Sequence, residues 1–183
     1  MSEPINDAGE RGMPTTVTYL ECVAHPSPPG PPRPLMKTAI LRCDNPPVHF
    51  YRYLYDTIGR DYFWVERRRW GDDVLAAMLA DPGVELYVLY VSGIPAGFAE
   101  LDFRDDKAGQ IAYFGLMPDF VGHRLGPWFL YQTCELAWAK PIAKLIVNTC
   151  TLDHPRALQT YQRMGFTPYS REERTIWLPA GFA

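Results

Sequence analysis

The sequence lacks the features that mark membrane, secreted and nucleic-acid-binding proteins. No apolar stretch approaches the roughly 18 uncharged residues that a membrane span needs. The N-terminus has no basic segment followed by an apolar one, so no secretory signal is predicted and we expect a cytoplasmic protein. The net charge of −3 at pH 7 argues against a dedicated nucleic-acid binder, which usually carries a basic excess. We therefore expect neither a nucleic-acid nor a membrane partner.

Cysteine and histidine are scarce and scattered along the chain. No two cysteines are close enough for a Cys-x-x-Cys pair, and no His-Glu-x-x-His sequence occurs, so no metal site is expected. Reduced thiols are the simplest expectation without a predicted secretory signal. The cysteines are Cys22, Cys43, Cys134 and Cys150, and the histidines are His25, His49, His123 and His154.

Enough apolar residues are present to bury a core. The 183 residues are 47% apolar and 14% aromatic, which predicts one globular domain rather than a disordered chain. Residues 1–14 are polar and predict a flexible N-terminal tail, so that the domain would occupy residues 15–183. Prolines crowd residues 26–34, which excludes a helix or a central strand and predicts an extended surface loop.

Hydrophobic periodicity predicts a mixed α/β order of elements. Runs of apolar and β-branched residues predict strands, and residues 84–91 and 94–103 read as a hairpin joined by a Ser-Gly turn. Apolar residues at helical spacing predict four helices. The strands are predicted at 15–22, 37–43, 84–91, 94–103, 110–117 and 144–151, with one or two more in 166–178; the helices are predicted from 45–47 to Gly59, from 71–72 to Leu79, at 124–139 and at 155–164.

The turn at residues 118–127, which leads into the third predicted helix, carries an anion-binding pattern. Gly122 and Gly126 let the backbone curl closely, and the first amides of the helix would face outward with a positive dipole potential. His123 and Arg124 add further donors. The turn is suited to a phosphate or pyrophosphate, although plain helix capping uses the same pattern. It matches neither a Walker loop nor the Rossmann glycine fingerprint.

A second segment, at residues 153–166, resembles the C-terminal signature of the GNAT N-acetyltransferases, commonly Asn-x-x-Ala-x-x-x-Tyr-x-x-x-Gly-Phe. The preceding 118–127 turn resembles the acetyl-CoA motif of this family, Gln/Arg-x-x-Gly-x-Gly/Ala, and the order of elements from about residue 84 to 178 agrees as well. The signature is matched by Ala157, Tyr161, Gly165 and Phe166, with His154 at the Asn position; in the turn Gly126 matches, whereas Val121 and Arg124 depart from Gln/Arg and from the first glycine.

This resemblance implies a single GNAT-like domain with a central mixed, mostly antiparallel sheet and about four helices. The parallel strands 110–117 and 144–151 would splay apart, and the pantothenyl arm of acetyl-CoA would enter between them. The arm would bond to the backbone of Leu116 and Met117, with a β-bulge nearby, and the pyrophosphate would lie on the amides of residues 121–126. The implied cofactor-binding residues are Leu116, Met117, Val121, Gly122, His123, Arg124, Leu125, Gly126, His154 and Tyr161.

The resemblance also implies catalytic roles. Tyr161 matches the family tyrosine whose hydroxyl lies near the CoA sulfur and acts as general acid toward the leaving thiolate. A protonated amine is not a nucleophile, so a base is needed as well. Glu100, flanked by apolar residues in its predicted strand, is our candidate base, although a solvated surface carboxylate fits that position equally well. Asp102 and His154 are further candidates.

The implied function is an acetyl-CoA-dependent N-acetyltransferase acting by direct attack of a primary amine, in a small molecule or a peptide. Pairing of strand edges makes a homodimer an open possibility. The altered acetyl-CoA motif leaves open a non-catalytic acyl-CoA-binding domain on the same fold. A thiol hydrolase built on Cys150, Asp153 and His154 is a third hypothesis. We interpret the basic run Arg67–Arg69 as a solvated face, with contact to an acidic substrate or to the 3′-phosphate of CoA as the alternative.

Overall fold

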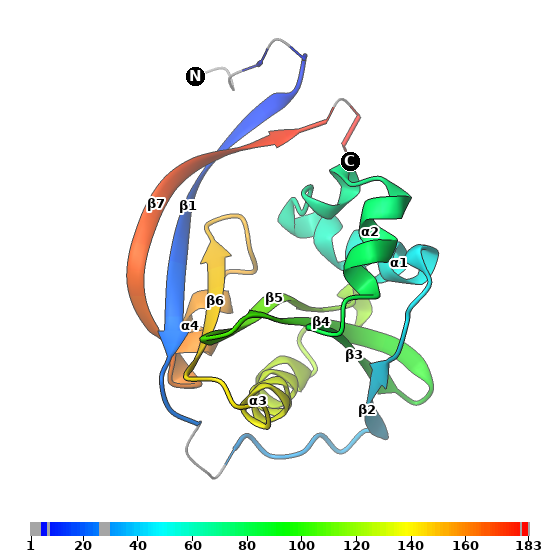
Figure 1. Ribbon diagram of the computed structural model, residues 1–183, viewed down its shortest axis with the longest axis vertical. Coiled ribbons are helices and arrows are strands. Elements are labelled where there is room, and N and C mark those ends of the chain that lie inside the picture. Colours follow the sequence, from blue (N-terminus) through cyan, green and yellow to red (C-terminus); the bar gives the residue numbers. More distant parts are fainter. Residues whose placement is uncertain (1–4, 7, 26–29, 180, 183) are drawn as a thin grey trace.

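The computed structural model describes residues 5–6, 8–25, 30–179 and 181–182 (Figure 1). Within them the predicted elements are present with small shifts at their ends, and the mixed α/β class is confirmed. The strands are β1 (Arg11–Cys22), β2 (Thr38–Cys43), β3 (Val84–Val91), β4 (Ile94–Asp105), β5 (Ala108–Leu116), β6 (Lys144–Cys150) and β7 (Thr167–Leu178); the α-helices are α1 (Val48–Gly59), α2 (Asp72–Leu79), α3 (Leu125–Trp138) and α4 (Ala157–Arg163), with short 3-10 turns at Arg60–Tyr62, Arg67–Arg69 and Pro118–Phe120.

A single seven-stranded sheet has the order β2-β3-β4-β5-β6-β1-β7. The pairing of β5 with β6 is parallel, and the other neighbouring pairs are antiparallel. This confirms the mixed, mostly antiparallel sheet. A parallel pair needs a crossover connection, which α3 supplies between β5 and β6.

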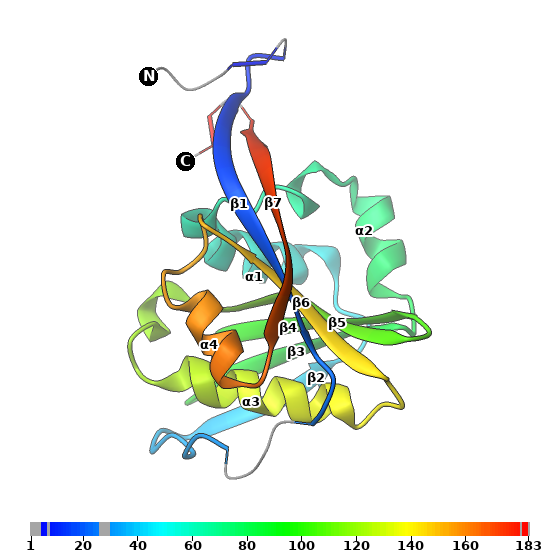
Figure 2. The same cartoon turned by 90° about the vertical axis from the view of Figure 1, so that its left-hand side faces the viewer.

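The place of β1 in the sheet was not predicted. It lies between β6 and β7, and β1 and β7 run side by side along their whole length (Figures 1 and 2). The strand begins at Arg11, earlier than the predicted residue 15, because residues 11–14 pair with residues 175–178 of β7. Of the predicted loop at 26–34, residues 26–29 lie outside the described part of the chain, and residues 30–34 belong to no helix or strand.

Side chains alternate between the two faces of the sheet and bury both faces. Helices α1 and α2 cover one face, and α3 and α4 cover the other (Figure 1). On β3, Leu86 and Val88 pack with the α1–α2 cluster, whereas Tyr87 and Leu89 belong to clusters on the α3 side. The same alternation places Glu100 on the α1 face of β4, and this assigns each site residue to one side of the sheet.

Helix α1 approaches β5 closely enough to require a glycine. A Cβ atom at Gly115 would clash with Cγ2 of Ile58, because the two atoms would be closer than carbon atoms pack. Ile58 itself is fully buried, so it has little room to move. This contact fixes α1 directly over the last residues of β5, where the candidate site begins.

Candidate functional site

The parallel pair at the centre of the sheet separates along its length. Residues Ala108–Ile111 of β5 pair with Lys144–Val147 of β6, and both strands then continue without pairing to each other. This is the splayed pair that the resemblance implies. The turns that follow both strands lie beyond their carboxyl ends, which is where open α/β sheets commonly bind ligands.

A β-bulge marks the point where the two strands part. Tyr113 pairs with Glu100 and Ile111 pairs with Leu101, so Ala112 is an extra residue in β5. The bulge therefore precedes the predicted location near residues 116–117. It reverses which residues of β5 face α1, and it turns the side chain of Tyr113 toward the α1 face beside Glu100.

The backbone of β5 beyond the bulge has one bonded edge and one edge that faces the gap. The N–H of Met117 donates to the carbonyl of Ala96 at 2.9 Å, so this predicted contact is already occupied by β4. Because bonding sides alternate along a strand, the N–H of Leu116 points the other way, toward the gap. Leu116, rather than Met117, has the amide that an extended ligand in the gap would meet.

The turn after β5 contains two residues with left-handed backbone. Gly122 has φ +88°, and Arg124 has φ +60° although it is not a glycine. Arg124 is the residue before α3, and Leu125 anchors the helix by burying its side chain. Val121, Gly122, His123 and Arg124 are exposed and Gly126 is half-buried, whereas the Val121 N–H already donates to the Pro118 carbonyl at 3.2 Å.

The loop and helix after β6 carry the other two predicted cofactor residues. Tyr161 is buried on α4, its ring meets Phe166 edge-on at 5.8 Å, and burial raises the pKa of its hydroxyl well above the usual range. His154 is half-buried, and its Nδ1 accepts a hydrogen bond from the Arg156 N–H at 3.1 Å. The His154 ring lies 6.3 Å from that of Tyr62, which links this loop to the helical layer.

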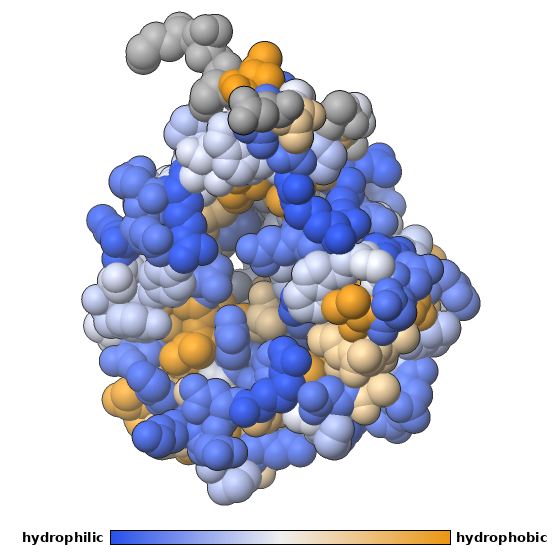
Figure 3. Space-filling view, turned by 45° about the horizontal axis from the view of Figure 1, so that its top comes forward, coloured by the Kyte–Doolittle hydropathy of each residue, from blue (hydrophilic) through white to orange (hydrophobic). Residues whose placement is uncertain are grey.

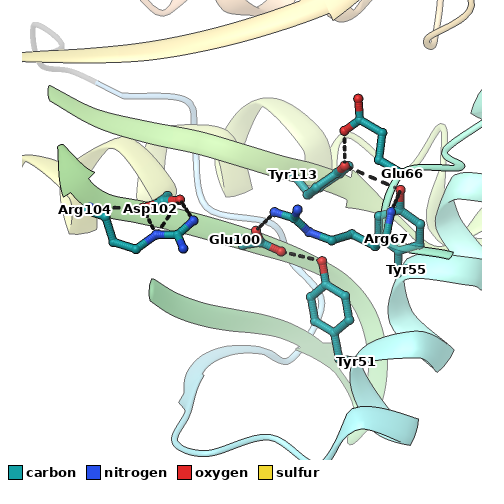
Figure 4. A network of polar contacts seen from close by, with 8 residues as sticks. All are labelled: Tyr51, Tyr55, Glu66, Arg67, Glu100, Asp102, Arg104 and Tyr113. Carbon is teal, nitrogen blue, oxygen red and sulfur yellow. Dashed lines mark hydrogen bonds and ion pairs between the residues drawn. The ribbon is translucent and has the colours of Figure 1, made fainter. Parts of the chain in front are cut away.

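Glu100 lies at the centre of a buried network on the α1 face (Figure 4). Its Oε1 accepts from Nη2 of Arg67 at 2.7 Å, and its Oε2 accepts from the Tyr51 hydroxyl at 2.5 Å. Burial, and then the charge of Glu100, raise the pKa of Tyr51. Burial alone would lower the pKa of Arg67, but the facing carboxylate of Glu100 outweighs it, so the guanidinium stays charged. The structure thus excludes the alternative of a solvated carboxylate at Glu100.

The interpretation of Arg67–Arg69 as a solvated face is wrong for its first member. Arg67 is 9% exposed, and its guanidinium stacks 4.0 Å from the centre of the Trp70 ring. Arg68 and Arg69 instead form ion pairs with acidic residues, Asp56 at 2.8 Å and Glu10 at 2.9 Å. The three residues form one 3-10 turn, so their side chains leave it in different directions, which a run of like residues does not reveal.

The further candidate base Asp102 is held by a neighbouring cation. Arg104 donates to both of its carboxylate oxygens (Figure 4). Burial raises the pKa of Asp102, but the hydrogen bonds from Arg104 outweigh that effect and leave it below the ordinary value. Asp102 is therefore a carboxylate that keeps its charge, which disfavours it as a proton acceptor.

A second set of polar contacts on the α1 face was not found by sequence reasoning. The Tyr113 hydroxyl donates to Oε2 of Glu66 at 2.8 Å, and the hydroxyls of Tyr55 and Tyr113 lie 3.5 Å apart. Trp64 packs against the Tyr113 ring at 5.0 Å. The aromatic character of residues 61–70 was the available signal, but sequence spacing does not show that Glu66 meets β5.

The structure does not arrange the cluster of Cys150, Asp153 and His154 as a catalytic triad of nucleophile, base and orienting group. One oxygen of Asp153 accepts from the Thr149 hydroxyl at 2.7 Å and from the Cys150 N–H at 2.8 Å, so it shapes the turn. Burial, and then the charge of Asp153, raise the pKa of the Cys150 thiol. A reactive cysteine needs a lowered pKa, so the thiol-hydrolase hypothesis is not supported.

The described residues add two further observations. They contain no group of three or more His, Cys, Asp and Glu side chains placed to hold a metal ion. None of the helices that the structure describes has both the length and the apolar character needed to cross a membrane.

Solved structures with the same fold include several acetyltransferases. A putative GNAT acetyltransferase from Novosphingobium aromaticivorans matches with TM-score 0.60 and 13% identity over 98% of this chain and 71% of its own. An aminoglycoside acetyltransferase from an uncultured soil metagenomic sample, in complex with trehalose, matches with TM-score 0.56 and 13% identity over 69% and 86%. A GCN5-related N-acetyltransferase from Sphaerobacter thermophilus matches with TM-score 0.61 and 16% identity over 93% of this chain, which spans 54% of that protein.

Identities this low establish the shared fold. None of the curated proteins compared with this chain matches it. The sequence model of the acetyltransferase (GNAT) family, however, matches residues 51–166, which is more than half of the chain and includes the splayed strands and both flanking turns. The chain therefore belongs to the GNAT family of N-acetyltransferases.

Proposed function

We propose that this protein transfers the acetyl group of acetyl-CoA to a primary amine of a small molecule or a peptide. The observation that carries the proposal is the unpaired edge of β5 beyond Ile111, which leads into a left-handed turn and the first amides of α3. An extended ligand whose amide-bearing arm ends in a diphosphate matches this arrangement. The amides of the arm can bond to the free edge of β5, and the diphosphate can bind at the N-terminus of α3. Acetyl-CoA has this chemistry.

Different residues would bind the different parts of acetyl-CoA. The Leu116 amide would bond to the pantetheine arm, and the amides of residues 122–126 would surround the pyrophosphate. The Arg124 guanidinium would add a charge-assisted bond to phosphate, which compensates for the missing glycine at this position. His123 would lie beside the phosphates, and His154 would line the opposite side of the gap.

The chemistry that we propose is direct transfer. The amine nitrogen attacks the carbonyl carbon of the thioester, a C–N bond forms, and the C–S bond breaks with its electron pair on sulfur. Tyr161 would donate its proton to that sulfur, and the raised pKa keeps its hydroxyl protonated at neutral pH. The sequence predicts Glu100 as the base, but both of its carboxylate oxygens already accept hydrogen bonds, from Arg67 and Tyr51.

The acceptor would approach from the α1 face, because the donor is expected to reach the gap from the α3 side. Figure 3 shows the surface hollowed between the β1–β7 side and the helical side of the molecule. A cavity of about 330 Å³ opens on this face beside the paired part of β5 and β6, and its lining includes Asp102, Asp105 and Gln110. That volume suits a small molecule or a single extended side chain.

Thiol release tests the proposal. The protein is incubated with acetyl-CoA and a panel of alkylamines, diamines, arylalkylamines, an aminoglycoside and a lysine peptide, and free CoA is measured. We expect release that depends on one class of amine and that falls about 100-fold or more in Tyr161→Phe. Calorimetry with CoA provides a second measurement, which Tyr161→Phe should leave nearly unchanged.

The competing function is a non-catalytic acyl-CoA-binding domain. Arg124 in place of a motif glycine, together with a Glu100 whose two oxygens are both bonded, favours this alternative. CoA binding by calorimetry with no turnover on any amine would support it. Absence of both binding and turnover would remove both functions.

A further inference from the structure

We propose that Glu66 receives the ammonium group of the acceptor and takes its first proton, so that the substrate class is a cationic primary amine. This inference rests on the proposed function. It assigns a catalytic role to a residue outside the strands and helices, in the segment between Arg60–Tyr62 and Arg67–Arg69.

Of the three carboxylates in the network on the α1 face, Glu66 is the one that forms no ion pair with the described residues (Figure 4). Glu100 is paired with Arg67, and Asp102 is paired with Arg104. Glu66 has one hydrogen-bond partner among the described residues, the Tyr113 hydroxyl, and no ion pair. Because the buried guanidinium of Arg67 is already neutralised by Glu100, it does not offset the negative charge of Glu66, which attracts a cation.

The position of Glu66 matches the place where an amine must attack. Its partner Tyr113 follows the bulge at Ala112, where β5 has just parted from β6. Glu66 lies beyond Tyr113 on the side away from Glu100 (Figure 4), and it is exposed. The Glu172 hydrogen bond is the main cause of the raised pKa of Arg174 on β7, and the charge of Glu66 adds to it, so Arg174 lies within electrostatic reach of Glu66.

Tyr113 holds Glu66 in place. Burial, and then the charges of Tyr55 and Glu66, raise the pKa of the Tyr113 hydroxyl, so it remains a neutral donor at neutral pH. The Tyr113 ring is itself fixed by edge-on contacts with Tyr55 at 4.9 Å and Trp64 at 5.0 Å. The bond from Tyr113 occupies Oε2 of Glu66 and leaves Oε1 for the amine.

The protons balance as follows. The ammonium gives one proton to Oε1 of Glu66, and the neutral amine attacks the thioester carbon. After attack the nitrogen carries a positive charge and loses a second proton to solvent, while Tyr161 protonates the leaving sulfur and is restored from solvent. Glu66 then releases the proton that it took to solvent and is a carboxylate again. The net change converts an ammonium and acetyl-CoA into an amide, CoA thiol and one released proton, so no other reactant is needed.

The test compares Glu66→Gln with Glu173→Gln on the best amine of the panel. Glu173 is a matched control, because it is also an exposed glutamate that accepts a hydroxyl bond, from Thr16, but on the face of β7 opposite Arg174. We expect a loss of about 100-fold or more in kcat/KM for the amine at neutral pH in Glu66→Gln. The KM for acetyl-CoA should stay near wild type, and Glu173→Gln should behave as wild type.

The pH dependence separates a proton acceptor from a structural residue. The free fraction of an alkylamine rises about tenfold per pH unit below its pKa near 10, so the loss in Glu66→Gln should shrink as the pH rises. The charged and titratable groups around Glu66 are Tyr113, Tyr55, Arg67 and Arg174. A loss of equal size at every pH, or wild-type turnover by Glu66→Gln, overturns this inference alone; no turnover by the unaltered protein overturns the proposed function too.

Discussion

Arg124 offers the sharpest test of how the backbone at the cofactor turn is held. Its φ of +60° lies in the left-handed region, which costs a non-glycine residue roughly 1–2 kcal/mol. Replacing it by glycine removes that cost, but glycine gains about 0.4–1 kcal/mol of freedom in the unfolded chain relative to alanine. Arg124→Gly should therefore be more stable than Arg124→Ala by roughly 0.5–1 kcal/mol, or about 1–4 °C in melting temperature for a chain of this size.

The comparison of the two variants cancels the loss of the guanidinium, because neither carries it. Arg156 provides the control, since it also precedes a helix and is exposed, but has an ordinary φ of −94°. At position 156 the order of stability should reverse, so that Arg156→Ala is more stable than Arg156→Gly. Urea unfolding of the four variants at equal m-values measures both differences. If Arg124→Ala proves as stable as Arg124→Gly, or more stable, the claim of backbone strain at this turn is refuted.

Three further outcomes follow from contacts in the core of the site. Glu100→Gln leaves the buried charge of Arg67 without its partner, so urea unfolding should show a loss of about 3–5 kcal/mol, and an unchanged midpoint would contradict the buried pair. Gly115→Ala should cost about 1–3 kcal/mol by overpacking, and its cost should be smaller when it is introduced into Ile58→Ala than into wild type; an equal cost in both backgrounds would argue against that clash. Because the pKa of Asp102 is lowered in the folded protein, its charged form stabilises the fold fully at pH values above the ordinary pKa of 3.8, and this stabilisation is lost as the pH falls through the folded-state pKa. The melting temperatures of wild type and Asp102→Asn should therefore converge in acid, which thermal melts over a series of pH values would measure.

Local patterns were sufficient to predict most of the elements. The hairpin of β3 and β4 and helix α2 appear where alternation and helical spacing place them, because those patterns reflect burial on one side of a single element. The splayed pair followed from the family resemblance carried by residues such as Tyr161 and Gly165. The cofactor and catalytic assignments for these residues remain predictions that the experiments above address.

What sequence reasoning missed depends on contacts between distant residues. Nothing in the composition of residues 11–22 indicates that they lie between β6 and β7, since strand order is set by the packing of the whole sheet. The inward turn of Arg67 and the contact of Glu66 with Tyr113 depend likewise on where the 60–70 segment crosses β5. Both contacts join residues that are far apart in the sequence, so no periodic pattern in the sequence indicates them.

The position of β1 has a consequence for how the protein is made. In the described sheet β7 is bordered by β1 alone, so β7 is joined to the rest of the sheet through a strand that is far from it in the sequence. Strand β1 can take its place in the sheet only after residues 144–178, which hold its partners on both sides, have been synthesised, and closing so large a loop is slow. Removal of β1 would leave β7 without a neighbouring strand, so β1 and β7 have to be regarded as a single structural unit.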